Sequence, residues 1–246
     1  MILLVDIGNS RLKWVMLERG ELQARGHAHH GKEGWEALAK QQWGGQPTPP
    51  ERVLVVSVAG SEARIALTDW SHSAWGIEPQ FVTSTASAGG VRNAYREHPE
   101  RLGADRWVAL IAARALTQQA CYVVDCGTAL TVDALAADGQ HLGGVIVPGV
   151  RLMREALYRN TRQIPPEGGS PQLFGRTTRD CVWGGAVHAV AAAIDGITER
   201  MEAAGGVGLR FLTGGYGEMI LPYLSGCYQL EPDLIFQGLR TLAEAG

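Results

Sequence analysis

Residues 2–13 read ILLVDIGNSRLK, and residues 121–131 read CYVVDCGTALT. Each stretch is an apolar run that ends in an aspartate (Asp6, Asp125), followed two residues later by a glycine and then by an amide or hydroxyl side chain. We interpret each as a strand, a tight turn and a second strand, because glycine lets backbone N–H groups approach phosphate oxygens closely. A single copy is as easily an ordinary Asp-Gly hairpin turn. Two copies favour nucleotide phosphates held between two lobes, and hence phosphoryl transfer.

The composition is that of a globular enzyme, with 246 residues, 46% of them hydrophobic and 19% charged. The net charge of -3 argues against a nucleic-acid or membrane partner, because both need a basic face. We find no unbroken apolar run of the roughly 18–20 residues that span a membrane, and no basic segment of a secretory signal. The four cysteines form no CxxC pair, which favours reduced thiols. We therefore expect a cytoplasmic protein.

Hydrophobic periodicity and turn residues predict a duplicated α/β organisation. The first half is expected to contain strands up to residue 7 and over 12–17, 21–27 and 53–58, helices over 31–42 and 61–71, a short strand near 81, a loop over 84–99 and a helix from 103. The second half is expected to contain strands up to 126, over 129–135, up to 147 and over 209–212, and helices over 150–160, 178–201 and after 232. This repeated order predicts two domains, 1–117 and 118–246.

The sequence Leu102-Gly103-Ala104-Asp105-Arg106 marks the start of a predicted helix. Asp105 is there either the N-cap of that helix or a carboxylate that accepts a proton from an attacking hydroxyl. No Glu or Gln follows three residues later, so the pattern is not a capping box. Arg106, at a helix N-terminus, would suit a substrate that bears a carboxylate.

Other motifs carry less weight. The turn Thr213-Gly214-Gly215 and the pair Pro148-Gly149 are compatible with close approach of a nucleotide, but each is as easily a plain turn. Arg11 and Lys13 share one face of a strand, so one of them could reach a phosphate. The histidines near residue 29 lack a fourth ligand at metal-binding spacing and are interpreted as a solvated strand end. There is no GxxxxGK[ST] or GxGxxG motif.

Together these motifs resemble the type III pantothenate kinases, in the superfamily of acetate kinases, sugar kinases and actin. The resemblance rests on motifs that cover nearly the whole chain: DIGNSRLK at 6–13, LGADRW at 102–107, DCGTALT at 125–131, GGVIVPG at 143–149, GRTT at 175–178, TGG at 213–215, and PDL with GL at 232–239. It implies an α/β, two-lobed, duplicated ribonuclease H-like (actin-like ATPase) fold with mixed sheets flanked by helices. It also implies transfer of the ATP γ-phosphate to the hydroxyl of pantothenate, giving 4'-phosphopantothenate in the first step of coenzyme A synthesis.

The resemblance implies roles for individual residues. Asp105 would be the general base. ATP would contact Asp6, Ile7, Gly8, Asn9, Ser10, Arg11, Leu12, Lys13 and Thr128. Pantothenate would contact Tyr95, Gly103, Ala104, Asp105, Arg106 and, from the partner subunit of a homodimer, Thr178. Asp6 would lie near Mg²⁺ through the phosphates, and Asp125 would bind a monovalent cation, K⁺ or NH₄⁺.

The chain departs from the family pattern in two places, and two other functions compete with this one. Thr177 stands where asparagine is usual, and the stretch from Tyr95 to Gly103 is one residue longer. One rival is another small-molecule kinase or a phosphatase of the same superfamily, such as a sugar kinase. The other is a non-catalytic accessory factor that affects transcription, which could lose Asp105 or Asp125, whereas this chain keeps both.

Overall fold

The computed structural model describes residues 1–30, 34–46, 48–165 and 168–245. The chain forms two compact units, one of Met1–Leu116 with Leu234–Gly246 and one of Thr117–Asp233. The boundary lies one residue before the expected division at 117/118. The last helix, α7 (Leu234–Ala245), departs from the expectation by belonging to the first unit, because its apolar face packs on α3 (Ala104–Leu116) and on the first sheet.

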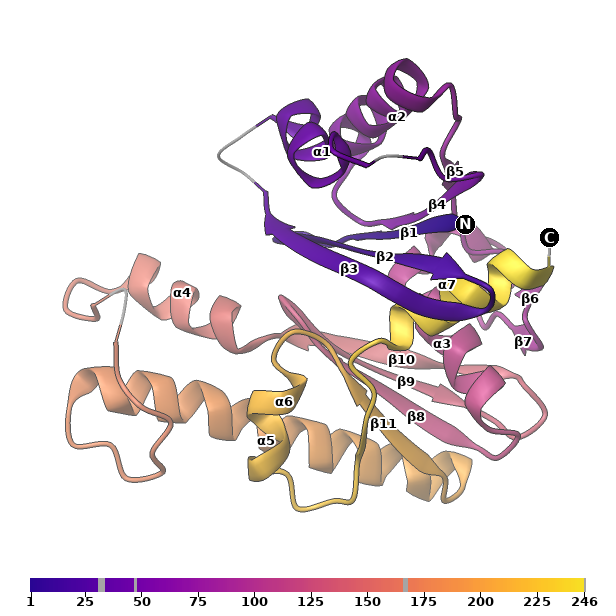
Figure 1. The fold of residues 1–246 in the computed structure, drawn as a ribbon. Coiled ribbons are helices and arrows are strands. Elements are labelled where there is room, and N and C mark those ends of the chain that lie inside the picture. The colour runs from indigo at the N-terminus through magenta and orange to yellow at the C-terminus, as the bar shows by residue number, and fades with distance from the viewer. Residues whose placement is uncertain (31–33, 47, 166–167, 246) are drawn as a thin grey trace. The chain divides into compact units, whose positions relative to one another are not determined.

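A five-stranded mixed sheet in the order β3-β2-β1-β4-β5 forms the centre of the first unit (Figure 1). Its strands are β1 (Ile2–Ile7), β2 (Arg11–Glu18), β3 (Glu21–His29), β4 (Arg52–Ser57) and β5 (Gln80–Phe81). The first three form an antiparallel meander, and β4 and β5 continue parallel to β1. The expected strands are confirmed, and Arg19, with a φ of 52°, occupies the expected tight turn between β2 and β3.

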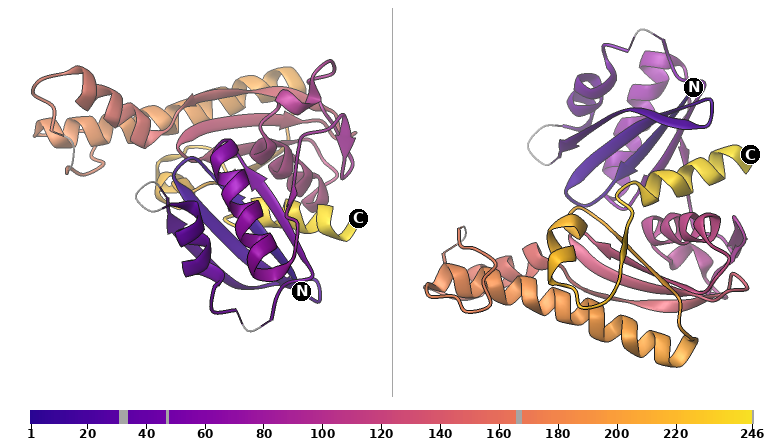
Figure 2. Two further views of the ribbon diagram at one scale, coloured as in Figure 1. Left: turned by 90° about the horizontal axis from the view of Figure 1, so that it is seen from above. Right: turned by 60° about the horizontal axis from the view of Figure 1, so that its bottom comes forward.

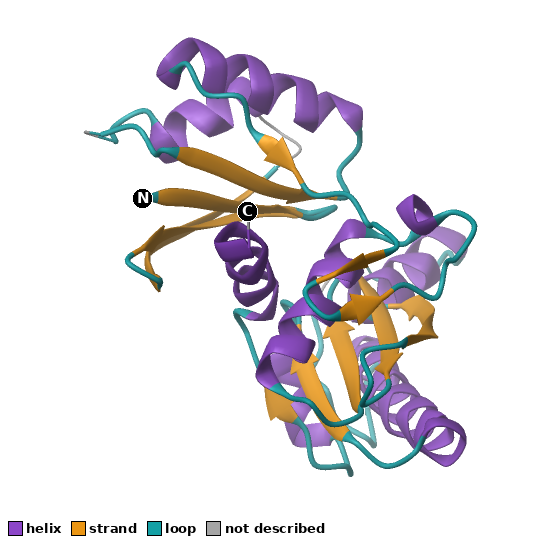
Figure 3. Ribbon diagram, turned by 90° about the vertical axis from the view of Figure 1, so that its right-hand side faces the viewer, coloured by secondary structure: helices purple, strands orange, loops and turns teal. Residues whose placement is uncertain are grey.

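Helices cover both faces of this sheet (Figure 3). Leu3, Val5 and Ile7 of β1 share a core with α1 (Trp35–Trp43) and α2 (Ser61–Trp75), which includes Trp43 and Trp70. Because side chains alternate along a strand, the even-numbered residues of β1 face the opposite side. Leu4 and Asp6 therefore point to the face on which α3 and α7 pack.

The second unit repeats the same sheet topology, in the order β10-β9-β8-β11-β12. Its strands are β8 (Cys121–Cys126), β9 (Ala129–Leu135), β10 (His141–Pro148), β11 (Leu209–Thr213) and β12 (Gln229–Leu230). Val124 and Cys126 share a core with Val187 and Val190 of the long helix α5 (Thr178–Gly205), which runs along one face of the sheet (Figure 2, orange). By alternation, Asp125 faces away from α5. The repeated order predicted from the sequence is confirmed.

The structure refines several boundaries. The remaining elements are β6 (Ser87–Ala88), β7 (Val91–Arg92), η1 (Pro99–Arg101), α4 (Val150–Asn160), α6 (Gly217–Ile220) and η2 (Leu221–Tyr223). The stretch expected as a loop over 84–99 thus contains a small hairpin and the start of a 3-10 turn, which are too short to show periodicity. The helix expected from residue 31 begins at Trp35, and residues 31–33 lie outside the described part of the chain.

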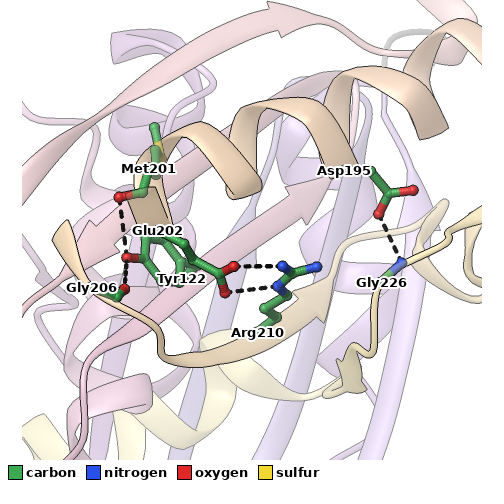
Figure 4. A network of polar contacts seen from close by, with 7 residues as sticks. All are labelled: Tyr122, Asp195, Met201, Glu202, Gly206, Arg210 and Gly226. Carbon is green, nitrogen blue, oxygen red and sulfur yellow. Dashed lines mark hydrogen bonds and ion pairs between the residues drawn. The ribbon is translucent and has the colours of Figure 1, made fainter. Parts of the chain in front are cut away.

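Polar contacts join the C-terminal end of helix α5 to the second sheet and its middle to the loop before β12 (Figure 4). Glu202 accepts two hydrogen bonds from the guanidinium of Arg210 on β11, at 2.9 and 2.6 Å. Tyr122 of β8 donates a hydrogen bond from its hydroxyl to the carbonyl of Gly206, at 2.5 Å. The Asp195 carboxylate accepts from the backbone N–H of Gly226 at 3.2 Å.

By length and composition α5 could cross a membrane, with a mean hydropathy of 1.3 over its most apolar window. The core helix of a soluble protein passes the same test, so this is weak evidence. Val187, Val190 and Ile194 of this helix are fully buried against the second sheet. Its apolar composition is thus explained by packing within the unit.

Candidate active site

The first Asp-x-Gly motif forms the predicted hairpin between β1 and β2. Asp6 is the direct cross-strand partner of Lys13, and the backbone N–H of Gly8 donates to the carbonyl of Arg11 at 3.0 Å, which closes the turn. The side chains of Ile7 and Leu12 are buried in the core. Within the expected ATP-binding stretch, these two residues can therefore offer a ligand only their backbone.

Asp6 has an unusual electrostatic environment. Burial raises the pKa of Asp6 to about 6, the positive charge of Lys13 lowers that pKa in part, and the negative charge of Asp105 raises it further. Asp6 and Asp105, expected to carry different roles, therefore interact electrostatically within one unit. A cation bound nearby would lower this pKa, because a positive charge favours the ionised carboxylate. The donor set thus fits the Mg²⁺ that accompanies nucleotide phosphates.

Asp105 lies in the first turn of α3, as the second residue of the helix. Its Oδ1 accepts a hydrogen bond from the backbone N–H of Arg106 at 2.8 Å. The alternative interpretation of Asp105 as the N-cap is wrong, because the helix begins at Ala104. A Cβ atom at position 103 would come within 2.7 Å of Asp105 Oδ1, so Gly103 leaves the room in which the carboxylate lies. Arg106 is buried.

The segment before α3 is held by the buried side chain of Asn93. Its amide donates to the carbonyls of Thr85 and Pro99, at 3.2 and 3.1 Å, and its oxygen accepts from the backbone N–H of Tyr95 at 2.9 Å. Tyr95 itself is exposed. One amide side chain thus joins the loop that carries Tyr95 to the turn that leads into Gly103.

A hollow of about 430 Å³ lies beside this turn in the first unit. It is lined by the end of β4, the first turns of α2, the segment after β5 and the start of α3. Gly103 and Ala104 belong to its wall. The sequence analysis missed the α2 side of this hollow, although the Ala59-Gly60-Ser61 sequence between a buried strand and a helix was a visible signal.

The second Asp-x-Gly motif forms the equivalent hairpin between β8 and β9. Asp125 is the cross-strand partner of Thr131, and the N–H of Gly127 donates to the carbonyl of Ala129 at 3.0 Å. The Asp125 carboxylate is partly buried, whereas the neighbouring Cys126 is fully buried. Burial, helped by the charge of Asp125, raises the pKa of the Cys126 thiol to about 12, so this cysteine stays protonated and unreactive.

The turns at Gly149 and Gly214, which are weak motifs in the sequence, both lie against this second hairpin. Thr213 of β11 pairs with Asp125 in parallel register. Gly214, with a φ of 91°, follows it, and a Cβ atom there would collide with the Asp125 carboxylate and with the backbone of Cys126. The N–H of Gly149 donates to the carbonyl of Thr128, in the turn of this hairpin, at 3.1 Å. The second unit therefore brings the turns at Gly149 and Gly214 to the hairpin that carries Asp125.

Thr178 is the exposed first residue of α5. Thr177 is the N-cap, and its hydroxyl oxygen accepts from the N–H of Asp180 at 3.1 Å. Hydrogen bonds from the hydroxyls of Thr177 and Ser170 lower the pKa of Asp180. Threonine and asparagine are both good N-caps, so the departure at Thr177 preserves the geometry that presents Thr178.

His30 lies against the first hairpin loop. Its ring Nε2 is 2.7 Å from the carbonyl oxygen of Gly8, and its ring lies 4.5 Å from that of Trp35. Within the described residues, no group of three or more His, Cys, Asp or Glu side chains could hold a metal ion. His27 and His29 are exposed on β3, as expected for a solvated strand end.

Comparison with known proteins identifies the family. The model of the type III pantothenate kinase family matches residues 2–200. The chain belongs to the type III pantothenate kinase family. A type III pantothenate kinase of Nitrosococcus oceani is 38% identical over 252 residues, covering 99% of this chain and 94% of that protein. One of Methylibium petroleiphilum is 38% identical over 250 residues, covering 98% of both.

Solved structures support the fold. A ROK family glucokinase from Streptomyces griseus, solved with glucose and AMPPNP, aligns with a TM-score of 0.54 over 100% of this chain and 99% of that one, at 12% identity. A Campylobacter jejuni protein described as a Baf family transcriptional activator aligns with a TM-score of 0.60 over 99% and 98%, at 19% identity. At such identities the likeness shows the fold alone. The predicted actin-like ATPase fold is confirmed.

The chain is therefore an ATP-dependent pantothenate kinase, and the predicted function is confirmed. It transfers the γ-phosphate of ATP to the hydroxyl of pantothenate, in the first step of coenzyme A synthesis. Family membership implies Mg²⁺ with ATP. Neither the sugar-kinase nor the accessory-factor alternative is supported, because the sequence match over the whole chain is to pantothenate kinases.

Proposed function

We propose that Asp105 is the general base of this kinase and that Asp6 to Lys13 hold the ATP phosphates. The observation that carries this assignment is the place of Asp105 in the first turn of α3, where Gly103 leaves room for its carboxylate, in the same unit as the hairpin in which Asp6 pairs with Lys13. In the proposed step the pantothenate hydroxyl oxygen bonds to the γ-phosphorus, and the bond from phosphorus to the β–γ bridging oxygen breaks. ADP leaves with that electron pair, and the hydroxyl proton passes to Asp105.

The remaining assignments divide between the units. Asp6 would lie near the Mg²⁺ ion that is bound to the ATP phosphates. That ion would supply positive charge to offset the negative charge that develops in the transition state. Gly103, Ala104, Arg106 and Tyr95 would line the pantothenate site. In the second unit, Thr128 would contact ATP and Asp125 would bind K⁺ or NH₄⁺. A single partly buried carboxylate supplemented by backbone turns suits a weakly bound monovalent cation.

We further propose a cytoplasmic homodimer in which Thr178 reaches the partner's pantothenate site. A comparison of the two equivalent edge strands β10 and β3 supports this surface assignment. The edge strand β10 exposes Leu142, Val145 and Ile146, whereas β3 exposes no large hydrophobic side chain. Exposed apolar residues continue on α4 and before α5, at Leu157, Tyr158, Leu173 and Phe174. An apolar edge strand of this kind is usually covered by another chain.

A coupled ADP-release assay tests the base and the cation site. With ATP, Mg²⁺ and K⁺, the wild-type protein should turn over pantothenate, and glucose should give no signal. Asp105→Asn should lower kcat by about 100-fold or more with an unchanged Kd for ATP, because only proton acceptance is lost. Near-wild-type kcat would exclude Asp105 as the base.

The same assay with Na⁺ in place of K⁺ tests Asp125. We expect turnover to fall in Na⁺ and to return with NH₄⁺. Asp125→Asn should give the same low rate with every cation. Equal rates of the wild-type protein in K⁺ and Na⁺ would remove the monovalent cation from the assignment while leaving the kinase reaction intact.

A further inference from the structure

His30 connects the end of β3 to the turn of the first hairpin, and none of the assignments above uses it. Its ring Nε2 lies 2.7 Å from the carbonyl oxygen of Gly8. A carbonyl oxygen can only accept a hydrogen bond, so Nε2 carries the hydrogen and donates it. The two residues are 22 positions apart in the same unit, so only the folded chain makes this contact.

An aromatic side chain holds the ring of His30 in place. The centre of the imidazole lies 4.5 Å from the centre of the Trp35 ring, with 36° between the two planes. Trp35 is the first residue of α1, and it packs against the core that includes Ile7. His30 is itself half-buried. Its ring is therefore fixed on the side of the sheet that α1 covers.

The hydrogen bond from His30 sets the direction of the next backbone N–H along the chain. The peptide between Gly8 and Asn9 is trans and planar, so its carbonyl and its N–H point in opposite directions. The carbonyl points to His30, on the α1 side. The N–H of Asn9 therefore points to the opposite side, to which Asp6 also turns by alternation along β1.

The N–H of Asn9 is available to a ligand. Asn9 is exposed, and within the described residues its N–H donates no hydrogen bond. The N–H of Gly8, by contrast, is used to close the turn with Arg11. A backbone N–H left open in a tight turn suits a phosphate oxygen.

We propose that His30 is a positioning residue for ATP, which holds the N–H of Asn9 toward the phosphates through the carbonyl of Gly8; this inference rests on the proposed phosphate site. Without the hydrogen bond the peptide can rotate, because glycine restricts the backbone less than any other residue. The N–H then points to the phosphates only part of the time. The apparent affinity for ATP falls in proportion to that fraction.

Two substitutions of His30 test the hydrogen bond in the coupled assay. His30→Phe keeps an aromatic ring against Trp35 and removes the donor, so the KM for ATP should rise about fivefold, the effect of one lost hydrogen bond. The KM for pantothenate and kcat should change by less than about twofold, because only binding of ATP is weakened. His30→Gln places an amide N–H donor where Nε2 lies and should restore most of the affinity for ATP. Loss of stability alone would be neither restored by glutamine nor confined to the KM for ATP.

His72→Phe is the matched control, because His72 is an exposed histidine on α2 of the same unit, and it should leave all three constants unchanged. Lys13→Met tests the proposed phosphate site separately. If Lys13→Met raised the KM for ATP and His30→Phe did not, the inference about His30 would be overturned while the phosphate site stood. An equal rise in His30→Phe and His30→Gln would also overturn it. If neither Lys13→Met nor His30→Phe changed the KM for ATP, the proposed phosphate site would fail, and the role of His30 with it.

Discussion

At the scale of single residues, Asp6 makes the free protein less stable than it could be. The folded chain raises the pKa of Asp6 from 3.8 to about 6, so folding favours the protonated form. Below about pH 4 the carboxyl group is protonated in both states and costs nothing. As the pH rises through 6, the folded state must accept a buried charge, and stability is lost. A cation bound beside Asp6 would offset this cost, because a positive charge favours the ionised carboxylate.

Asp6→Asn should therefore stabilise the ligand-free first unit at neutral pH. The gain relative to wild type should grow from near zero at pH 4 to at most about 3 kcal/mol at pH 7, from a shift of about two pKa units. Urea unfolding at several pH values, followed by tryptophan fluorescence, measures this difference. Asp69→Asn, at an exposed aspartate on α2, is the control and should show no such trend. A pH-independent difference for Asp6→Asn would contradict the prediction.

At the scale of elements, the ion pair between Glu202 and Arg210 joins α5 to β11. Both side chains are largely buried, with exposed fractions of 13% and 15%. The hydrogen bonds from Arg210 lower the pKa of Glu202. The stability that this pair contributes is therefore present above the ordinary pKa of a glutamate and is lost as the pH falls through the lowered value.

Glu202→Ala should destabilise the second unit by about 3 kcal/mol at pH 7, because it leaves the Arg210 guanidinium buried without its partner. The double variant Glu202→Leu/Arg210→Met should recover much of this loss, since it removes both charges. Denaturant unfolding of each variant gives the values, with Arg200→Gln on the same helix as control. If Glu202→Ala were as stable as wild type, the ion pair would contribute nothing to the free energy of unfolding.

At the scale of the whole molecule, a shared active site predicts complementation between subunits. Asp105→Asn and Thr178→Ala should each have low activity at a pantothenate concentration below KM. Each site takes Asp105 from one subunit and Thr178 from the other. In a mixed dimer, one site therefore combines two unchanged residues, whereas the other combines both substitutions. After the two variants are mixed and their subunits exchange, activity should rise to about a quarter of wild type, because half of the dimers then carry one intact site of two.

The oligomeric state must be measured beside this complementation. Sedimentation velocity should show a dimer for wild type and a monomer for the double variant Ile146→Asp/Phe174→Asp. The control is Val207→Asp, whose side chain is 88% exposed but lies outside β10, α4 and the segment before α5. A monomeric wild type, or mixed variants that do not gain activity, would remove Thr178 from the acceptor site.

The sequence alone determined the chemistry and the repeated strand order of this protein, and the tertiary structure decided which residues act together. Each Asp-x-Gly motif is a local hairpin, so apolar periodicity and turn residues suffice to predict it. Pairing and packing between distant segments decide instead the electrostatic interaction of Asp6 with Asp105, the approach of Gly214 to Asp125 and the place of α7 in the first unit. No local pattern in the sequence records a contact that only the folded chain makes.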